Sequence, residues 1–117
     1  GTMRQGEVYW VLGEEPYGSK PGYRRPWLVV QNNLTNATLL NTVLACPLTS
    51  NMRRAQAPGN VVLRRREGGL PNESVVQVVG LSPVERTLFD ELIGAVSSVR
   101  LGQVLAGIIG VLEPREP

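Results

Sequence analysis

Glycine and proline recur throughout this chain and divide its apolar residues into short runs. The sequence contains 13 glycines and 9 prolines. Short runs of Val, Leu, Ile, Tyr and Trp between such residues are typical of β-strands joined by turns. The pattern therefore favours a fold of five or six short strands followed by one terminal helix.

The expected strands follow the apolar runs. They cover residues 7–12, 27–31, 42–48, 60–65 and 74–79, with a sixth over 90–96. Pro47 is expected to interrupt the third strand, because proline cannot donate a ladder hydrogen bond. Between the strands we expect a loop over 13–23, a turn-like segment with one helical turn over 32–41, and a polar loop over 49–59.

Two segments carry signals for a helix start. In the segment Ser82-Pro83-Val84-Glu85, the serine suits the cap, the proline suits the first helical position and the glutamate completes a capping box. We therefore predict a helix of one or two turns there. A second helix is predicted to begin after Ser97 or Ser98.

The terminal helix has apolar residues at helical spacing, and Pro114 should end it. These residues are Leu101, Val104, Leu105, Ile108, Ile109 and Leu112. Three glycines within the helix weaken it intrinsically. It therefore needs a packing partner, which is either the sheet or a second subunit.

Together these elements predict a mostly β chain with helices, of the α+β class, forming a small, partly open barrel with a C-terminal helix. A length of 117 residues suits one domain, expected over 3–113. Residues 1–2 precede Met3 and resemble a tag remnant.

Two scarce residue types exclude several kinds of chemistry. The chain has no histidine and a single cysteine, Cys46, so the usual zinc sites and a histidine general base are excluded within one chain. A disulfide framework is impossible, which fits a reducing cytoplasm. Cys46 lies in an apolar run and is expected to be buried. No stretch is long and apolar enough for a membrane span, so we expect a cytoplasmic protein without a membrane partner.

Arginine dominates the positive charge, although the net charge is only +2. Lys20 is the only lysine, whereas arginines cluster at 24–25, 53–54 and 64–66. Arginine binds phosphate oxygens with two parallel hydrogen bonds, which suits a nucleic-acid partner. A solvated strand or loop is the alternative explanation for the cluster at 64–66.

Several segments in order resemble the MazF/PemK-like toxins of type II toxin–antitoxin systems. They are residues 4–10 (RQGEVYW), 22–26 (GYRRP), 28–32 (LVVQN), 46–51 (CPLTSN) and 68–71 (GGLP). Each is weak alone, but the order and spacing match the family over about 3–112.

The resemblance implies a fold, an activity and partners. The fold would be the SH3-like barrel shared with the CcdB gyrase poisons. The activity would be metal-independent, sequence-selective cleavage of single-stranded RNA, usually messenger RNA, leaving 2′,3′-cyclic phosphate and 5′-hydroxyl ends. The unit would be a cytoplasmic homodimer without a cofactor, silenced by a MazE-like antitoxin whose disordered acidic tail fills the RNA groove. DNA binding would occur together with the antitoxin.

The resemblance also assigns site residues. The family's catalytic arginine before the proline matches Arg25, and its catalytic threonine after the third strand matches Thr49. No residue is assigned to a metal. The residues expected to bind RNA are Tyr17, Ser19, Lys20, Arg24, Ser50, Asn51, Arg53 and Gln77. Trp10 or Tyr17 could stack on a base, although Tyr9 and Trp10 are expected to pack in the core.

The chemistry of RNA cleavage explains how an arginine and a threonine could stabilise the charge that develops on phosphorus. The 2′-hydroxyl of the RNA is the nucleophile, so the protein must position it, move two protons and stabilise charge on phosphorus. The fork of Arg25 suits the phosphate oxygens, and Thr49 can donate a further hydrogen bond. An arginine is a poor proton carrier because its pKa is above about 12. A carboxylate or water therefore remains an alternative for moving the protons.

The chain departs from the family pattern at four positions. Leu12 and Lys20 stand where relatives often carry acids, Gly80 where a polar residue often follows the fifth strand, and Trp27 where a small aliphatic residue is usual. Glu14 and Glu15 could substitute for the missing acids in a shifted register.

These departures keep two alternative functions open. One is a non-catalytic binding module, either an inactive relative or a gyrase poison. The other is a generic SH3-like domain that binds peptides, although such grooves are lined by aromatic residues and this chain has few.

Overall fold

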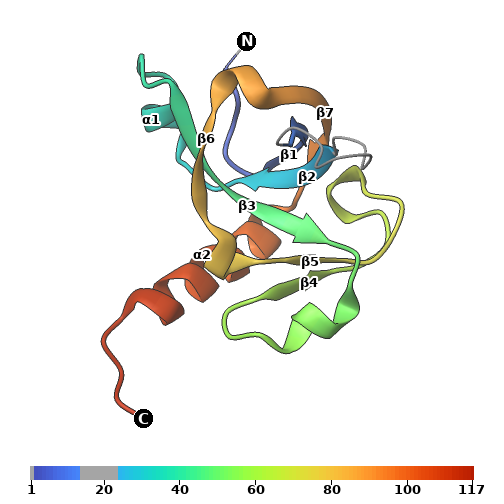
Figure 1. The fold of residues 1–117 in the computed structure, drawn as a ribbon, viewed down its shortest axis with the longest axis vertical. Helices are drawn as coiled ribbons and strands as arrows, with labels where there is room; N and C mark the ends of the chain where they lie inside the picture. Colours follow the sequence, from blue (N-terminus) through green and yellow to red (C-terminus); the bar gives the residue numbers. More distant parts are fainter. Residues whose placement is uncertain (1, 14–23) are drawn as a thin grey trace, which may run out of the picture.

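The computed structural model describes residues 2–13 and 24–117, and its centre is a curled antiparallel sheet (Figure 1). The sheet has seven strands in the order β4-β5-β3-β2-β1-β7, and β6 pairs with β3 beside this path. The sheet curls into a half-barrel with a helix at the C-terminal end of the chain, which confirms the predicted fold class. The sequence pattern predicted one strand too few.

The strands are short, as the glycine and proline pattern predicted. Their bounds are β1 Glu7–Leu12, β2 Arg24–Val29, β3 Thr42–Thr49, β4 Val61–Leu63, β5 Ser74–Val76, β6 Ser82–Glu85 and β7 Phe89–Ala95. Two α-helices, α1 (Asn33–Asn36) and α2 (Ser98–Leu112), and four 3₁₀ turns complete the described chain. The turns are η1 Met52–Gln56, η2 Glu67–Gly69, η3 Val78–Gly80 and η4 Arg86–Leu88.

Strand β3 runs through Pro47 without a break, contrary to the expected interruption. On one side β3 pairs with β2, where Trp27 lies opposite Pro47. On the other side β3 pairs with β6 up to Ala45 and with β5 from Leu48 onward. Pro47 therefore lies where β3 changes partners, so its missing N–H costs no ladder bond.

The helix predicted at Ser82 is wrong, because this segment forms strand β6. Val84 pairs with Val43 of β3 and is buried at 7% exposure in an apolar cluster with Val11 and Ala45. The Ser82 hydroxyl donates to the carbonyl of Gly80 at 2.8 Å instead of capping a helix. Burial and strand pairing thus outweigh the local capping signal. The only helical remnant in this segment of the described chain is the 3₁₀ turn η4.

Strand β5 ends three residues earlier than predicted, at Val76. Residues 78–80 turn as η3, and a side chain at Gly80 would meet the ring of Pro47, with a Cβ 2.7 Å from its Cγ. The polar residue that follows the fifth strand is therefore Gln77, and Gly80 meets a steric demand of the turn.

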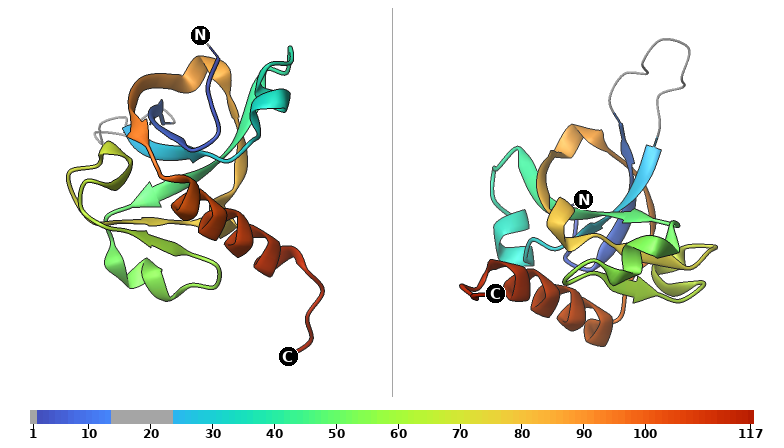
Figure 2. Two further views of the ribbon diagram at one scale, coloured as in Figure 1. Left: turned by 180° about the vertical axis from the view of Figure 1, so that it is seen from behind. Right: turned by 60° about the horizontal axis from the view of Figure 1, so that its bottom comes forward.

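Helix α2 lies across one side of the sheet, and the C-terminal tail leads away from the body (Figure 2). The Ser97 hydroxyl caps it by accepting from the amide of Arg100 at 3.1 Å. Val104 is buried in the main core, whereas Val99 and Ile109 are more than half exposed. Gly107 packs directly on the backbone of Gly59. One face of α2 therefore packs on the body of the same chain, which is one of the two packing partners expected from the sequence.

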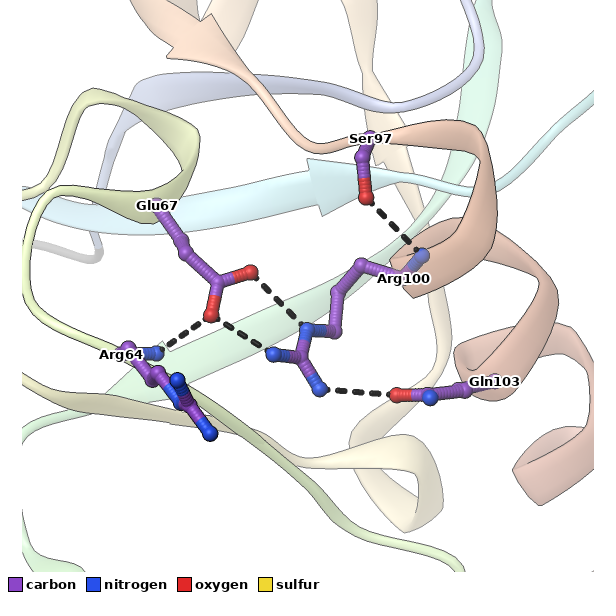
Figure 3. A network of polar contacts seen from close by, with 5 residues as sticks. All are labelled: Arg64, Glu67, Ser97, Arg100 and Gln103. Atoms are coloured by element: carbon purple, nitrogen blue, oxygen red, sulfur yellow. Dashed lines mark hydrogen bonds and ion pairs between the residues drawn. The ribbon is translucent and has the colours of Figure 1, made fainter.

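A salt bridge joins the start of α2 to the loop after β4 (Figure 3). Arg100 donates from Nε and Nη2 to the two carboxylate oxygens of Glu67 at 2.9 and 2.7 Å. Glu67 also accepts from the amide of Arg64 at 2.8 Å, and Arg100 donates to Gln103 at 2.8 Å. We call Glu67 and Arg100 the helix clamp. None of the described helices is long and apolar enough to cross a membrane.

Candidate active site

The structure brings Arg25 and Thr49 together at one end of β2 and β3. These strands are antiparallel, with Trp27 opposite Pro47. Continuing that register by two residues sets Arg25 opposite Thr49. Both residues line one cavity of about 310 Å³, which we call the central cavity. The two residues matched to the family's catalytic pair therefore face the same space.

The central cavity offers hydroxyl, amide and guanidinium groups over an apolar floor. Its described lining consists of Trp10, Arg25, Pro26, Leu48, Thr49, Ser50, Leu70, Pro71, Asn72 and Ser74. Arg25 is exposed, so its guanidinium can meet a ligand in solvent. Among these described residues there is no carboxylate. Glu14 and Glu15, the suggested substitutes for the missing acids, lie outside the described residues.

The loop after β3 holds Thr49 and Ser50 in place through two local hydrogen bonds. The hydroxyl oxygen of Thr49 accepts a hydrogen bond from the backbone N–H of Asn51 at 3.1 Å. The hydroxyl group can still donate its own hydrogen to a ligand. The Asn51 side chain accepts from the amide of Arg53 at 3.1 Å and caps η1. Asn51 therefore shapes this loop, while Ser50 lines the cavity. Arg53 is exposed on η1.

Two further hollows adjoin the central cavity and share residues with it. A hollow of about 730 Å³ shares Arg25, and one of about 610 Å³ shares Ser50 and Asn72. The second also includes Arg65. The central cavity, with Arg25 and Thr49, thus adjoins both other spaces through shared residues, and we call the three together the row of hollows.

Arg24 has partners of its own, although it is the sequence neighbour of Arg25, and one of them, Trp10, lines the central cavity. Its guanidinium pairs with Asp90 at 3.0 Å and lies over the ring of Trp10, 5.0 Å from the centroid. Successive residues of a strand face opposite sides of the sheet. The described linings of the three hollows do not include Arg24. Its expected role in RNA binding therefore stays a prediction.

The remaining predicted RNA-binding residues fall into two groups. Gln77 is half-buried, and its backbone N–H donates to the carbonyl of Pro47 in β3 at 3.0 Å. Its side chain is not among the described linings of the three hollows. Tyr17, Ser19 and Lys20 lie outside the described residues.

Sequence reasoning missed several residues that the fold places in the row of hollows. Asn72 and Ser74 line the central cavity, because β5, which begins at Ser74, pairs with the end of β3 next to Thr49. Their polarity and their place just after the family-like GGLP segment could have indicated them. Trp27 was noticed as unusual, but its place beside Arg25 was not predicted.

Two ionisable groups away from the cavity, Cys46 and Tyr9, are part of the packing. Burial raises the pKa of the Cys46 thiol to about 12, and Cys46 is fully buried as predicted. Burial, together with a hydrogen bond to Glu7, raises the pKa of Tyr9 to about 12. The ring of Tyr9 packs edge-on against Phe89 in the core, as expected. Among the described residues, no three His, Cys, Asp or Glu side chains gather where a metal ion could be held.

Comparison with known proteins decides the family. The model of the PemK-like, MazF-like toxins of type II toxin–antitoxin systems matches residues 4–112. The chain belongs to this family. Endoribonuclease MazF2 of Mycobacterium bovis is 38% identical over 112 residues, which is 96% of this chain and 98% of the relative. Endoribonuclease MazF6 of Mycobacterium tuberculosis matches to the same extent.

Solved structures of MazF proteins share the fold of this chain. A MazE–MazF crystal structure from Deinococcus radiodurans has a TM-score of 0.79 at 23% identity and covers 96% of both chains. A mycobacterial endoribonuclease in complex with its cognate antitoxin has a TM-score of 0.75 at 22% identity and covers 98% of this chain and 99% of its own. The SH3-like barrel inferred from the sequence is thus confirmed.

Proposed function

We propose that this PemK/MazF-family endoribonuclease toxin cleaves single-stranded RNA sequence-selectively and without a metal ion. The single observation that carries the proposal is the central cavity, where Arg25 and Thr49 face the same space. These are the residue types that an RNA phosphodiester needs, a guanidinium fork and a hydroxyl donor. The names of the relatives that are 38% identical support the same reaction class.

The reaction uses the RNA's own 2′-hydroxyl as the nucleophile. Its oxygen forms a new bond to phosphorus, while the bond to the 5′-oxygen of the next nucleotide breaks. The 2′-proton leaves to a base, and the departing oxygen gains a proton. The products are a 2′,3′-cyclic phosphate and a 5′-hydroxyl, and no water is consumed in this step. A metal is unnecessary where positioned donors stabilise the phosphorane charge.

Arg25 takes the role of charge stabiliser in this scheme, and Thr49 donates to the same phosphate. Arg25 transfers no proton in this scheme, because a guanidinium group is a hydrogen-bond donor that is not deprotonated in proteins. The protons are moved by water or by a carboxylate outside the described lining. Ser50 and Asn72, which join the central cavity to the next hollow, supply further polar contacts to the strand.

The row of three hollows is the path of the RNA strand in this proposal. The strand passes Arg25 and Thr49 in the middle and reaches Arg65 at one end. We expect the positive charges of Lys20, Arg24 and Arg53 to contribute to RNA binding, although Lys20 lies outside the described residues. Backbone contacts of this kind make binding salt-dependent.

Partners follow from the same surface. A MazE-like antitoxin silences the toxin by placing an acidic segment in the row of hollows. The crystal structure of a mycobacterial endoribonuclease with its cognate antitoxin supports such a partner. We further propose a cytoplasmic homodimer. Its interface would cover apolar side chains that one chain leaves more than half exposed, such as Val99 and Ile109 of α2.

One experiment separates the nuclease from a non-catalytic binding module. The purified protein is incubated with a long mixed-sequence RNA in excess EDTA, and the fragment ends are mapped by mass spectrometry. We expect discrete cuts with cyclic phosphate ends that are lost in Arg25→Ala and Thr49→Ala. Intact RNA with a folded wild-type protein would contradict the proposal. Gyrase binding would then be tested next.

A further inference from the structure

The larger of the two described hollows that adjoin the central cavity is lined mainly by apolar side chains. Its volume is about 730 Å³, and Arg25 forms the wall that it shares with the central cavity. Apolar contributions come from Leu12, Trp27, Pro47 and Leu88. A hollow with such a lining suits an apolar or aromatic group better than a phosphate.

Trp27 lines this hollow and packs against buried apolar side chains. It packs against the buried cluster of Val11, Ala45 and Val84, and it remains half-exposed. Trp27 and Arg25 are two residues apart on β2, so they face the same side of the strand about 7 Å apart. An indole fixed in this way presents an aromatic surface next to the guanidinium.

We propose that the Trp27 hollow binds the base of one nucleotide that flanks the cleaved linkage. The inference rests on the proposed RNA cleavage and names a specificity-determining residue for it. A phosphate held by Arg25 sets the neighbouring base at the mouth of the hollow, where it stacks on Trp27. Unpaired bases of single-stranded RNA are commonly bound by stacking on aromatic side chains.

Glu85 gives this base site a chemical preference. Glu85 is exposed and lines the same hollow as Arg25 and Trp27. A carboxylate accepts hydrogen bonds from an exocyclic amino group, as on cytosine, adenine or guanine, whereas uracil has no such group. Uracil can donate to the carboxylate only from its ring N3–H, so we expect the site to prefer an amino-bearing base at this position.

An RNA base suits the hollow better than an apolar side chain of a protein partner. Arg25, which shapes the reaction site, also forms the wall of the hollow, so any occupant lies next to the bound phosphate. In RNA each base is tied to such a phosphate by its own sugar. The hollow also offers two different contacts to a base: the Glu85 carboxylate can accept from the base edge, and the Trp27 ring can stack on the base face.

The test combines variants of Trp27 with RNA that lacks single bases. Short RNAs carrying the mapped cleavage site are made with an abasic nucleotide on either side of the cut. We expect wild-type kcat/KM to fall about 5- to 100-fold for one of the two positions. Trp27→Leu should lose a similar factor on intact RNA and lose little more on that abasic RNA. Trp27→Phe, the matched control, should keep most of the activity on intact RNA.

Base preference and binding give two independent readouts. Glu85→Gln should reduce the preference for an amino-bearing base over uracil at the same position. In Trp10→Phe, Trp27 is the only tryptophan. A non-cleavable RNA with a 2′-deoxy nucleotide at the cut should quench its fluorescence, and the abasic RNA should not. These readouts do not depend on the stability of a Trp27 variant.

Two results would overturn the base site while leaving RNA cleavage intact. One is a Trp27→Leu variant that cuts RNA as fast as the wild type. The other is a pair of losses, from Trp27→Leu and from the abasic nucleotide, that multiply as independent effects do. An antitoxin side chain would then be the better occupant. If the wild type cuts no RNA at all, the proposed function itself fails, and the fluorescence measurement still decides whether a base binds.

Discussion

Arg100 and Arg25 show how differently one residue type is used in two regions of this molecule. In the helix clamp, Arg100 is half-buried and binds both carboxylate oxygens of Glu67. At the row of hollows, Arg25 is exposed and lines two adjoining hollows. The planar guanidinium of Arg100 binds a carboxylate of the same chain. The same planar geometry suits the guanidinium of Arg25 for binding the phosphate of a ligand.

The difference teaches that the surroundings of an arginine decide its role. The clamp joins α2 to the loop after β4, two segments far apart in the sequence. Its effect should therefore fall on stability. Arg25 lies between two hollows and should act on ligands. Variants in the two regions should separate activity from stability, and the predictions below test that separation.

Replacing Arg25 should have the largest effect, and it should fall on activity. We expect Arg25→Ala to lower kcat/KM for RNA about 10²- to 10³-fold, because a positioned donor to the transition state is lost. Arg25→Lys should also be impaired, since an ammonium group cannot form the bidentate contact. Rates are measured on the mapped RNA site, and melting temperatures show whether the fold is kept. An active Arg25→Ala variant would break the comparison.

Breaking the helix clamp should have the next largest effect, and it should fall on stability. Arg100→Met should lower the free energy of unfolding by about 1.5–3 kcal/mol at neutral pH, because charge-assisted hydrogen bonds are lost. Arg115→Met is the matched control, since Arg115 forms an exposed pair with Glu113 and should matter little. Chemical denaturation measures both. Equal effects of the two variants would contradict a stabilising clamp.

The clamp also predicts a direction for the pH dependence. The hydrogen bond from Arg100 holds the pKa of Glu67 below its ordinary value. The carboxylate therefore contributes fully above the ordinary carboxyl range, and its contribution is lost as the pH falls through the lowered pKa. The stability difference between wild type and Arg100→Met should shrink on acidification. A difference that stays constant down to low pH would argue against this linkage.

Thr49 should have a smaller effect than Arg25, again on activity. Thr49→Val keeps the side-chain shape but removes the hydroxyl, and we expect kcat/KM to fall about tenfold through loss of one hydrogen bond to a charged group. The variant also loses the acceptor for the amide of Asn51. Thr49→Ser restores the hydroxyl and serves as the control. If serine fails to restore the rate, Thr49 acts through loop structure instead.

Arg24 should have the smallest effect. Its ion pair with Asp90 is about half exposed, so Arg24→Ala should change the free energy of unfolding by less than about 1 kcal/mol. We also expect only a small loss of cleavage, because Asp90 offsets its charge. Asp90→Asn is the informative partner variant, since it should raise cleavage at low salt if Arg24 contacts RNA. If neither Arg24→Ala nor Asp90→Asn changes the cleavage rate, Arg24 does not contact the RNA.

The sequence predicted the strands well where burial and local preference agree. Strand β1 has the predicted bounds, and the Ser97 cap of α2 was among the predicted options. The prediction failed at Ser82, where a good capping box became strand β6 because Val84 is buried against β3. It also failed at Gly80, whose role is to leave room for the Pro47 ring. Both errors arise from partners distant in the sequence.

The candidate site was predictable only as a set of residue types. The motif resemblance singled out Arg25 and Thr49, and the fold places both in the central cavity. The different surroundings of Arg24 and Arg25 were not predictable, because the sequence presents them as one basic pair. Arg24 is engaged by Asp90 of β7 and by the ring of Trp10, whereas Arg25 lines two of the hollows. The entry of Asn72 depends on the path of a loop far along the chain.

By itself, the sequence determined the class of fold and the available chemistry. Its glycines, prolines and short apolar runs require small strands, and the lack of histidine excludes the commonest proton carrier. Only the tertiary structure decided which arginine would stabilise a helix and which would face the hollows beside Thr49. The physical reason is that the surroundings of a charged group are built by strands and loops that are distant in sequence. Composition and motif spacing do not record those contacts.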